Sequence, residues 1–90
     1  MDNFIYRCID AVWWSIGTNE CDPDELYESL NVVWFCKTLQ NHKAMVMSTH
    51  DIFDHVYWEV TYNGNKDEYY VDEYTKKSNT VVQGEDIESM

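Results

Sequence analysis

The stretch that decides the fold is EVTYNGNKDEYYVDEY, residues 59–74. Alternating apolar and polar residues flank an Asn-Gly pair, which is the strongest short-range signal of a β-hairpin. We predict strands at His55–Tyr62 and Asp67–Tyr74, with side chains that point alternately to two faces. The face predicted to be buried carries Trp58, Val60, Tyr62, Tyr69 and Val71. The opposite face carries tyrosines and acids, namely Tyr57, Glu59, Thr61, Glu68, Tyr70, Asp72 and Tyr74.

The charges of this hairpin predict its register. A two-residue Asn-Gly loop would set Glu59 directly opposite Glu68, and facing like charges destabilise an antiparallel ladder. A four-residue loop, Asn63–Lys66, sets Glu59 opposite Tyr70 instead. We therefore expect the longer loop, and either register keeps the same faces because the two differ by two positions.

Two helices are predicted ahead of the sheet. Asp2–Ile16 has an apolar residue at every fourth position, and Gly17 follows where a left-handed C-terminal residue is expected. The apolar row is Phe4, Cys8, Val12 and Ile16, and a second row of Tyr6, Asp10 and Trp14 lies away from the core side. A short helix, Pro23–Leu30, has Asp22 as its N-cap and a proline in its first turn.

Two further β-rich runs separate the second helix from the hairpin. They are Val32–Leu39 and Lys43–Thr49, and the polar Gln40–His42 between them is predicted to be a turn. A single helix from Pro23 through Leu39 is the alternative, but it would contain two valines, Trp, Phe and Thr in close succession. We therefore predict strands.

Together these elements predict an α+β fold. An N-terminal amphipathic helix and a short second helix cover one face of a four-stranded antiparallel sheet, whose strands follow chain order as a β-meander. The buried side should include Trp34, Val46, Trp58, Val60, Tyr69 and Val71, although the inward parity of the first two strands stays open. Residues 1–82 form one domain, in which Val81 and Val82 can extend a sheet edge, and residues 83–90 form a frayed tail.

The composition limits the kinds of partner. The 90 residues include 17 acidic and 6 basic side chains, which gives a formal net charge of −11. A field of this sign repels nucleic-acid phosphates and anionic membranes, because both are bound through clustered Lys and Arg. We expect no direct binding to nucleic acid or membrane, and we expect a partner protein with a basic surface.

The cysteines indicate a reducing compartment. Cys8, Cys21 and Cys36 are odd in number and widely spaced, and no apolar signal-peptide run precedes them. No run approaches the roughly 18–20 apolar residues of a membrane span. The expectation is a cytoplasmic protein with reduced thiols. Since the chain has neither a C-x-x-C pair nor a glycine-rich phosphate loop, no cofactor is expected.

Two stretches resemble a known set of proteins. They read VWFCKTLQN-x-KA from Val33 and YWEVTYNGNKDEYYVDEY-x-K from Tyr57. They resemble a family of small proteins without assigned function that are encoded by phages and prophages, mostly of Gram-positive bacteria. The resemblance covers about half of the chain, Val33–Lys77, and the segment HDIFDH is less typical of it. It implies a phage accessory protein made in the infected host cell, and it carries over no catalytic residue.

One cluster has side chains of the metal-ligating type, His50-Asp51-Ile52-Phe53-Asp54-His55. Two His and two Asp in six residues could hold a divalent metal, but the spacing matches no helical i,i+4 pair and no standard motif. Asp and His are also common in loops for turn reasons, so we expect no metal here. A small metal-dependent or acid–base enzyme centred on this cluster is the alternative hypothesis.

The leading hypothesis is a non-enzymatic interaction protein. Tyrosines are enriched at protein interfaces, and carboxylates can bind the Lys and Arg residues that otherwise hold phosphates. The tyrosine- and acid-bearing face of the hairpin is then expected to bind and inhibit a host protein, such as a nucleic-acid-handling or defence enzyme with a basic groove. The row of Tyr6, Asp10 and Trp14 is a second candidate contact. A homo-oligomeric assembly factor, such as a dimer paired through an edge strand, is the third hypothesis.

Overall fold

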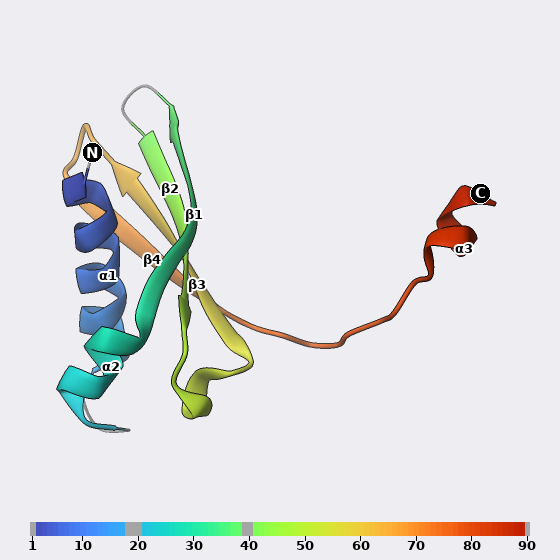
Figure 1. Cartoon of the computed structure of the whole chain (residues 1–90). Coiled ribbons are helices and arrows are strands. Elements are labelled where there is room, and N and C mark those ends of the chain that lie inside the picture. Colours follow the sequence, from blue (N-terminus) through green and yellow to red (C-terminus); the bar gives the residue numbers. More distant parts are fainter. Residues whose placement is uncertain (1, 18–20, 39–40, 90) are drawn as a thin grey trace.

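The computed structural model describes residues 2–17, 21–38 and 41–89, and it confirms the α+β fold (Figure 1). The elements are α1 (Asp2–Ile16), α2 (Pro23–Ser29), β1 (Leu30–Thr38), β2 (Asn41–Ser48), the 3-10 helix η1 (Asp51–Phe53), β3 (Val56–Asn63), β4 (Glu68–Thr75) and α3 (Gly84–Glu88). The strands form one antiparallel sheet in the predicted order β1-β2-β3-β4. Within the described ranges, no helix has the length and apolar character needed to cross a membrane.

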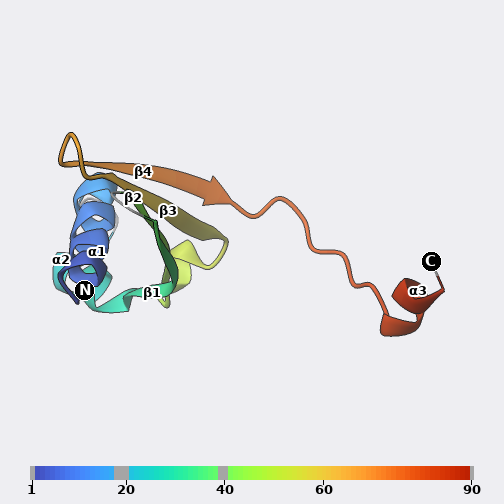
Figure 2. The ribbon, with the colours of Figure 1, turned by 90° about the horizontal axis from the view of Figure 1, so that it is seen from above.

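The core lies between α1 and the sheet. α1 contributes its predicted apolar row, since Phe4, Cys8 and Val12 are buried, and the sheet contributes Ala44, Val46, Trp58 and Val60. The helix is followed by Gly17 at a φ of +79°, a left-handed conformation that glycine adopts without a Cβ clash. Both α1 and α2 lie on one side of the sheet, which curls around α1 (Figure 2). No helix of the described chain covers the other side of the sheet.

The second helix has the predicted start. An Asp22 side-chain oxygen accepts a hydrogen bond from the Asp24 backbone N–H at 2.9 Å, which confirms the N-cap. Leu30 already has extended backbone angles, φ −84° and ψ 132°, and it opens β1. The alternative of one long helix is therefore wrong, because the β-branched and aromatic run after Leu30 lies in a strand.

A bulge in β1 overturns one core prediction. The ladder with β2 pairs Val32 with Val46 and next pairs Trp34 with Met45, so Val33 is an extra residue. Residues after the bulge change sides, and Trp34 therefore points away from the helices and is 53% exposed. The prediction that Trp34 is buried is wrong. Among the other predicted core residues, Val46, Trp58 and Val60 are buried, and Tyr69 and Val71 pack against them.

β2 begins earlier than the sequence predicts. Asn41 and His42, which were expected in a turn, are its first residues, while the preceding positions 39–40 lie outside the described residues. The His42 ring meets the Phe4 ring edge-on at a centroid separation of 4.9 Å and lies 5.8 Å from the Tyr62 ring. A polar residue type did not mark a turn here, because the imidazole ring packs between aromatic rings on the helix-facing side.

The β3–β4 hairpin has the predicted faces but not the predicted register. Its loop consists of residues 64–67, one position later than expected, and Glu59 consequently faces Asp72. The turn chemistry explains the shift, since the Asn63 side chain accepts a loop backbone hydrogen bond at 3.0 Å and Asp67 takes a φ of 52°. Asn and Asp favour these two roles. The expectation that like charges avoid facing positions in this ladder is wrong.

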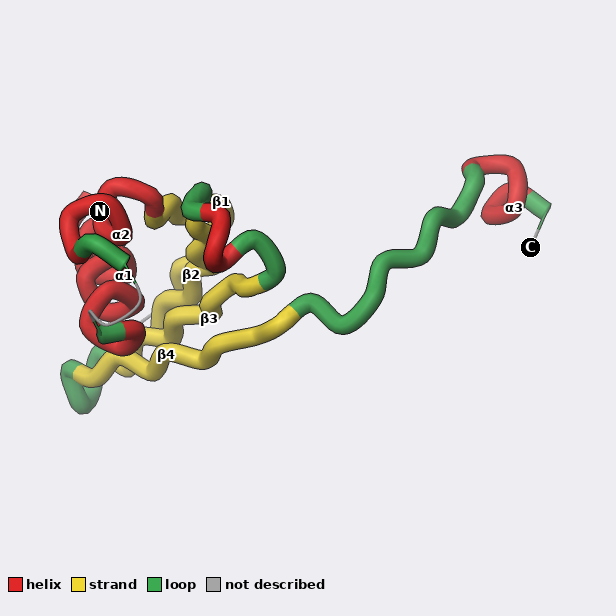
Figure 3. Tube along the Cα trace, turned by 90° about the horizontal axis from the view of Figure 1, so that it is seen from below, coloured by secondary structure: helices red, strands yellow, loops and turns green. Residues whose placement is uncertain are grey.

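After β4 the chain leaves the body of the molecule (Figures 1 and 3). Residues 76–83 belong to no helix or strand, and α3 forms at their far end, where the sequence predicts a frayed tail. Val81 and Val82 are 75% and 57% exposed. The Cα radius of gyration is 15.8 Å, against about 12 Å for a compact chain of this length. The difference reflects a C-terminal segment that does not pack on the sheet.

Candidate protein-binding surfaces

The seven residues predicted from the hairpin lie together on the uncovered side of the sheet. This surface, called the outer face below, carries Tyr57, Glu59 and Thr61 from β3 and Glu68, Tyr70, Asp72 and Tyr74 from β4. The registers and the β1 bulge add Trp34, Cys36, Lys43, Met45 and Met47 from β1 and β2. Successive side chains of a strand point to opposite faces, and Ala44 and Val46 are fully buried on the helix side. Their neighbours in β2 therefore lie on the outer face.

Glu59 is the centre of the charged part of the outer face. It faces Asp72 on β4, while Lys43 Nζ of β2 lies 3.6 Å from Glu59 Oε1. The side chains of Lys43 and Glu59 are 50% and 32% exposed, so this ion pair is hydrated and contributes less than about 1 kcal/mol. Among the described residues, no Lys or Arg lies within ion-pair distance of Asp72. One carboxylate of the facing pair is therefore uncompensated.

Tyrosine rings surround these acids. Tyr57 and Tyr74 stack across the strands, with ring centroids 5.0 Å apart and planes 10° from parallel. The Tyr70 hydroxyl donates a 2.6 Å hydrogen bond to Glu68, which raises the pKa of Tyr70 above its ordinary value. Tyr70 and Tyr74 are 43% and 37% exposed. Stacking on Tyr57 across the strands holds the Tyr74 ring, and the bond to Glu68 within β4 holds the Tyr70 ring. The outer face therefore offers rigid aromatic contact area next to negative charge.

The other predicted row lies on the opposite side of the molecule. Tyr6, Asp10 and Trp14 project from the solvent side of α1, where Tyr6 is 62% and Trp14 82% exposed. Asp10 Oδ1 accepts a 2.8 Å hydrogen bond from the Tyr27 hydroxyl of α2, and this bond raises the pKa of Tyr27. Because α1 covers the helix side of the sheet, this row and the outer face lie on different sides of the sheet (Figure 2).

An open groove of about 1020 Å³ runs beside Trp14. Residues from α1, α2 and β4 line it, including Arg7, Asp10, Trp13, Trp14, Tyr27 and Tyr69. The Trp13 indole N–H donates to the Pro23 carbonyl at 3.1 Å, and Arg7 donates to the Tyr69 hydroxyl at 3.5 Å. No sequence pattern predicts this groove, because the two helices that form it meet β4, which lies far from them in the chain.

Five outer-face residues were missed in the sequence analysis, and Lys43, Met45 and Trp34 show why. The strand pattern of β2 contained the signal for the first two, since a buried Ala44 and Val46 would have placed Lys43 and Met45 outward. Trp34 had no such signal, because its orientation depends on the bulge at Val33.

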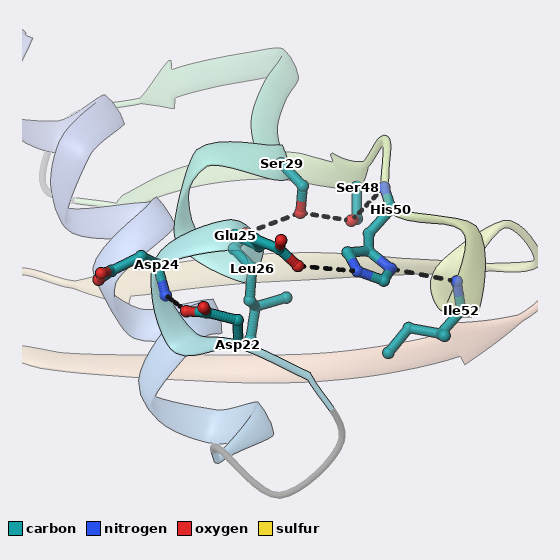
Figure 4. A network of polar contacts seen from close by, with 8 residues as sticks. All are labelled: Asp22, Asp24, Glu25, Leu26, Ser29, Ser48, His50 and Ile52. Atoms are coloured by element: carbon teal, nitrogen blue, oxygen red, sulfur yellow. Dashed lines mark hydrogen bonds and ion pairs between the residues drawn. The ribbon is translucent and has the colours of Figure 1, made fainter.

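His50 has a structural role in the histidine cluster (Figure 4). Its Nδ1 accepts a hydrogen bond from the Ile52 backbone N–H at 3.4 Å, and this bond caps η1. Its Nε2 lies 3.9 Å from Glu25 of α2, and its backbone N–H donates to the Ser48 hydroxyl at 3.0 Å. The ring thus joins η1 to α2, and the backbone N–H ties His50 to the end of β2.

The rest of the cluster does not converge on a point. Asp51, Asp54 and His55 are exposed, and the imidazole of His55 lies 3.4 Å from its neighbour Asp54. Across the described ranges, no group of three or more His, Cys, Asp or Glu side chains could hold a metal ion. The geometry therefore gives no support to the alternative of a metal-dependent enzyme centred on residues 50–55.

The fold and its surfaces define a class, a small α+β domain with both body helices on one side of an open four-stranded meander. Residues 5–84 match the sequence model of DUF6275, a family of unknown function, and the chain belongs to that family. The match extends from α1 through the whole sheet and includes the extended segment after β4. No curated protein and no solved structure matches the chain significantly.

Proposed function

We propose that the chain is a non-enzymatic protein-binding domain whose outer face binds a basic surface of another protein. The observation that carries this proposal is the facing pair of Glu59 and Asp72 in the β3–β4 ladder. Like charges directly opposite each other cost roughly 0.2–1 kcal/mol of stability relative to a neutral pair. A 90-residue domain has little stability to spare, so a repulsive pair on an open surface supports a role in binding.

A cationic side chain from a partner would remove this cost. An Arg or Lys placed between the two carboxylates replaces their repulsion by attraction and by charge-assisted hydrogen bonds, which are about twice as strong as neutral ones. The stacked pair of Tyr57 and Tyr74 lies on the same face and supplies apolar contact area beside the charge. Charge thus orients the partner, and the aromatic rings contribute most of the buried area.

Two features of the sequence support a particular kind of partner. With a net charge of −11, the chain favours proteins whose binding sites are positively charged, such as enzymes that hold nucleic acid in a basic groove. The resemblance of Val33–Lys77 to phage-encoded proteins supports a partner in the infected bacterial cell. Under this proposal the chain is a phage accessory protein of the host cytoplasm, and it inhibits a nucleic-acid-handling or defence enzyme by occupying the groove.

Affinity capture with matched charge reversals tests the proposal. The protein and a Glu59→Lys/Glu68→Lys/Asp72→Lys variant are used to capture proteins from a bacterial lysate, and the captured protein is purified and titrated by calorimetry. The control, Glu85→Lys/Asp86→Lys/Glu88→Lys, makes the same change in net charge in α3. We expect the outer-face variant to lose binding and the α3 control to keep it.

Two further measurements locate the interface. Binding should weaken strongly when the salt concentration rises from about 0.05 M to 0.5 M, because exposed charges are screened at the higher ionic strength. A third variant, Asp10→Lys/Asp24→Lys/Glu28→Lys, reverses the acids beside the groove. Loss of binding in this variant alone would transfer the interface to the α1 side and refute the proposal for the outer face.

A further inference from the structure

The β1 strand is an open edge of the sheet. It pairs with β2 on one side, and its other side carries unpaired backbone groups. Val33, Trp34 and Phe35 are 53%, 53% and 39% exposed, and Lys37 is the one charged residue of the strand. A β-forming edge with exposed apolar side chains and little charge binds further strands unless something covers it.

The same chain contains an extended segment, residues 78–83, that pairs with no strand of the described structure. Residues 78–83 read SNTVVQ, carry no charge and include Val81 and Val82, which are 75% and 57% exposed. The segment starts close to the sheet, since the Lys76 backbone N–H donates to the His55 carbonyl at 2.7 Å. It then extends away from the body toward α3 (Figures 1 and 3). The segment also lies within the part of the chain that matches DUF6275, because the match reaches residue 84.

We propose that residues 78–83 of one copy of the chain pair with the β1 edge of a second copy, and that the exchange is reciprocal. Each sheet then gains a fifth strand, and the two copies form a closed dimer with two-fold symmetry. Val81 and Val82 become covered, and the apolar part of β1 after the bulge at Val33 receives a neighbour on its open side.

Charge argues against a dimer that pairs two β4 edges directly. β4 contains Glu68, Asp72 and Glu73, so two β4 strands that met across a dimer axis would bring like charges together. The neutral segment 78–83 and the single Lys37 of β1 carry no such conflict. The lengths also agree, because six extended residues span about 20 Å, which fits within the nine-residue β1.

The distance between the two edges of the sheet favours pairing of β1 with the tail of a second copy over pairing with the tail of the same chain. The tail leaves the sheet from β4, and β1 lies at the opposite edge, three strand spacings or about 14 Å away. An extended chain needs about four to five residues to cross that distance. The crossing would consume residues 76–80 and leave too few for a strand along β1, whereas a second copy can present the whole segment.

Disulfide trapping tests the exchange, because Cys36 is an exposed thiol on β1. Val81→Cys and Val82→Cys variants of the full chain are oxidised mildly, and the linked peptides are identified by mass spectrometry. Alternate residues of a strand point to opposite faces, so we expect one of the two variants to form a disulfide with Cys36 of another chain. The control Ile87→Cys places the thiol in α3, and the link to Cys36 should be absent there.

Sedimentation across a range of protein concentrations gives the second readout. The wild-type chain should form a dimer, and Val82→Pro, which removes a backbone N–H from the proposed strand, should raise the dimer dissociation constant by about tenfold or more. Val82→Thr keeps the N–H and the β-propensity and should remain close to wild type. Three results overturn the proposal: a monomer at every concentration, a link between residue 36 and the tail within one chain, or a dimer that is insensitive to Val82→Pro.

Discussion

Asp72 is a residue whose charge is expected to destabilise the free protein. It faces Glu59 across the ladder, and the Lys43 ion pair engages Glu59 only. Replacing Asp72 by Asn removes the repulsion and keeps the size of the side chain, so the free energy of unfolding should rise by about 0.2–1 kcal/mol. Urea denaturation at low salt measures the change.

Salt and a matched variant separate this effect from net charge. The gain from Asp72→Asn should shrink as salt screens the facing carboxylates. Glu85→Gln makes the same change in net charge in α3 and should leave stability nearly unchanged. A loss of stability in Asp72→Asn would mean that the carboxylate has a favourable partner in solution.

Cys8 and Cys36 should differ sharply in reactivity. Burial raises the pKa of the Cys8 thiol from 9.0 to about 12, whereas Cys36 is exposed. At pH 8 an alkylating reagent should label Cys36 quickly and Cys8 only after unfolding, because the thiolate is the reactive species. Peptide mass spectrometry reads out both sites in one sample, and equal labelling of the two would contradict the core position of Cys8.

The same shift gives a pH dependence with a defined sign. The folded-state pKa of Cys8 lies above the unfolded value, so folding keeps the thiol neutral where the unfolded chain ionises. Its contribution to stability is therefore complete below about pH 9 and is lost as the pH rises toward 12. Thermal unfolding between pH 8 and pH 11 should show a falling midpoint, and a midpoint that rises in this window would contradict the assignment.

At the level of single elements, the periodicity of apolar residues predicted the buried and exposed faces correctly, whereas the chemistry of single residues was a poorer guide to turns and register. The α1 row of Phe4, Cys8 and Val12 is buried as the fourfold repeat indicates, and the alternation in β3 and β4 gives the correct faces. These patterns follow from helix and strand geometry alone. The outer-face residues of the hairpin were predictable for the same reason.

The errors arose at a β-bulge and at a hairpin loop, where the local backbone conformation decides which residues face each other. The bulge at Val33 reverses the sides of Trp34 and its successors, and the loop at 64–67 shifts the hairpin by two positions. Both depend on local backbone conformations that no hydrophobic pattern encodes. The groove beside Trp14 was also unpredictable, since three separate elements form it.

Truncation of Trp58 and of Trp34 should have very different effects on stability, because the bulge places Trp34 on the outer face. Trp58 is fully buried, and its indole N–H donates to Glu73 at 3.0 Å, whereas Trp34 is 53% exposed on the outer face. Trp58→Ala should lower the free energy of unfolding by about 3–5 kcal/mol, and Trp34→Ala by less than about 1 kcal/mol. Urea unfolding followed by circular dichroism compares them, and similar losses would argue against the bulged register.

For the whole molecule, the extended tail sets the first site of proteolysis. Lys77 lies in residues 76–83, outside every helix and strand, while Lys37 and Lys43 lie in paired strands. Trypsin should therefore cleave after Lys77 first, at protein concentrations low enough to keep the chain monomeric. Cleavage in β1 or β2 before the tail, seen by mass spectrometry at short times, would contradict this arrangement.

The curl of the sheet around α1 has a consequence for recognition. A sheet that wraps a helix on one side is convex on the other, so the outer face bulges toward its surroundings (Figure 2). A flat partner would touch only a narrow strip of such a surface. A concave partner can enclose the same surface and exclude water from the carboxylates of Glu59 and Asp72, which strengthens each contact with a cation. If the outer face binds a partner as proposed, the curvature favours a cleft over a plane surface as the binding site on that partner.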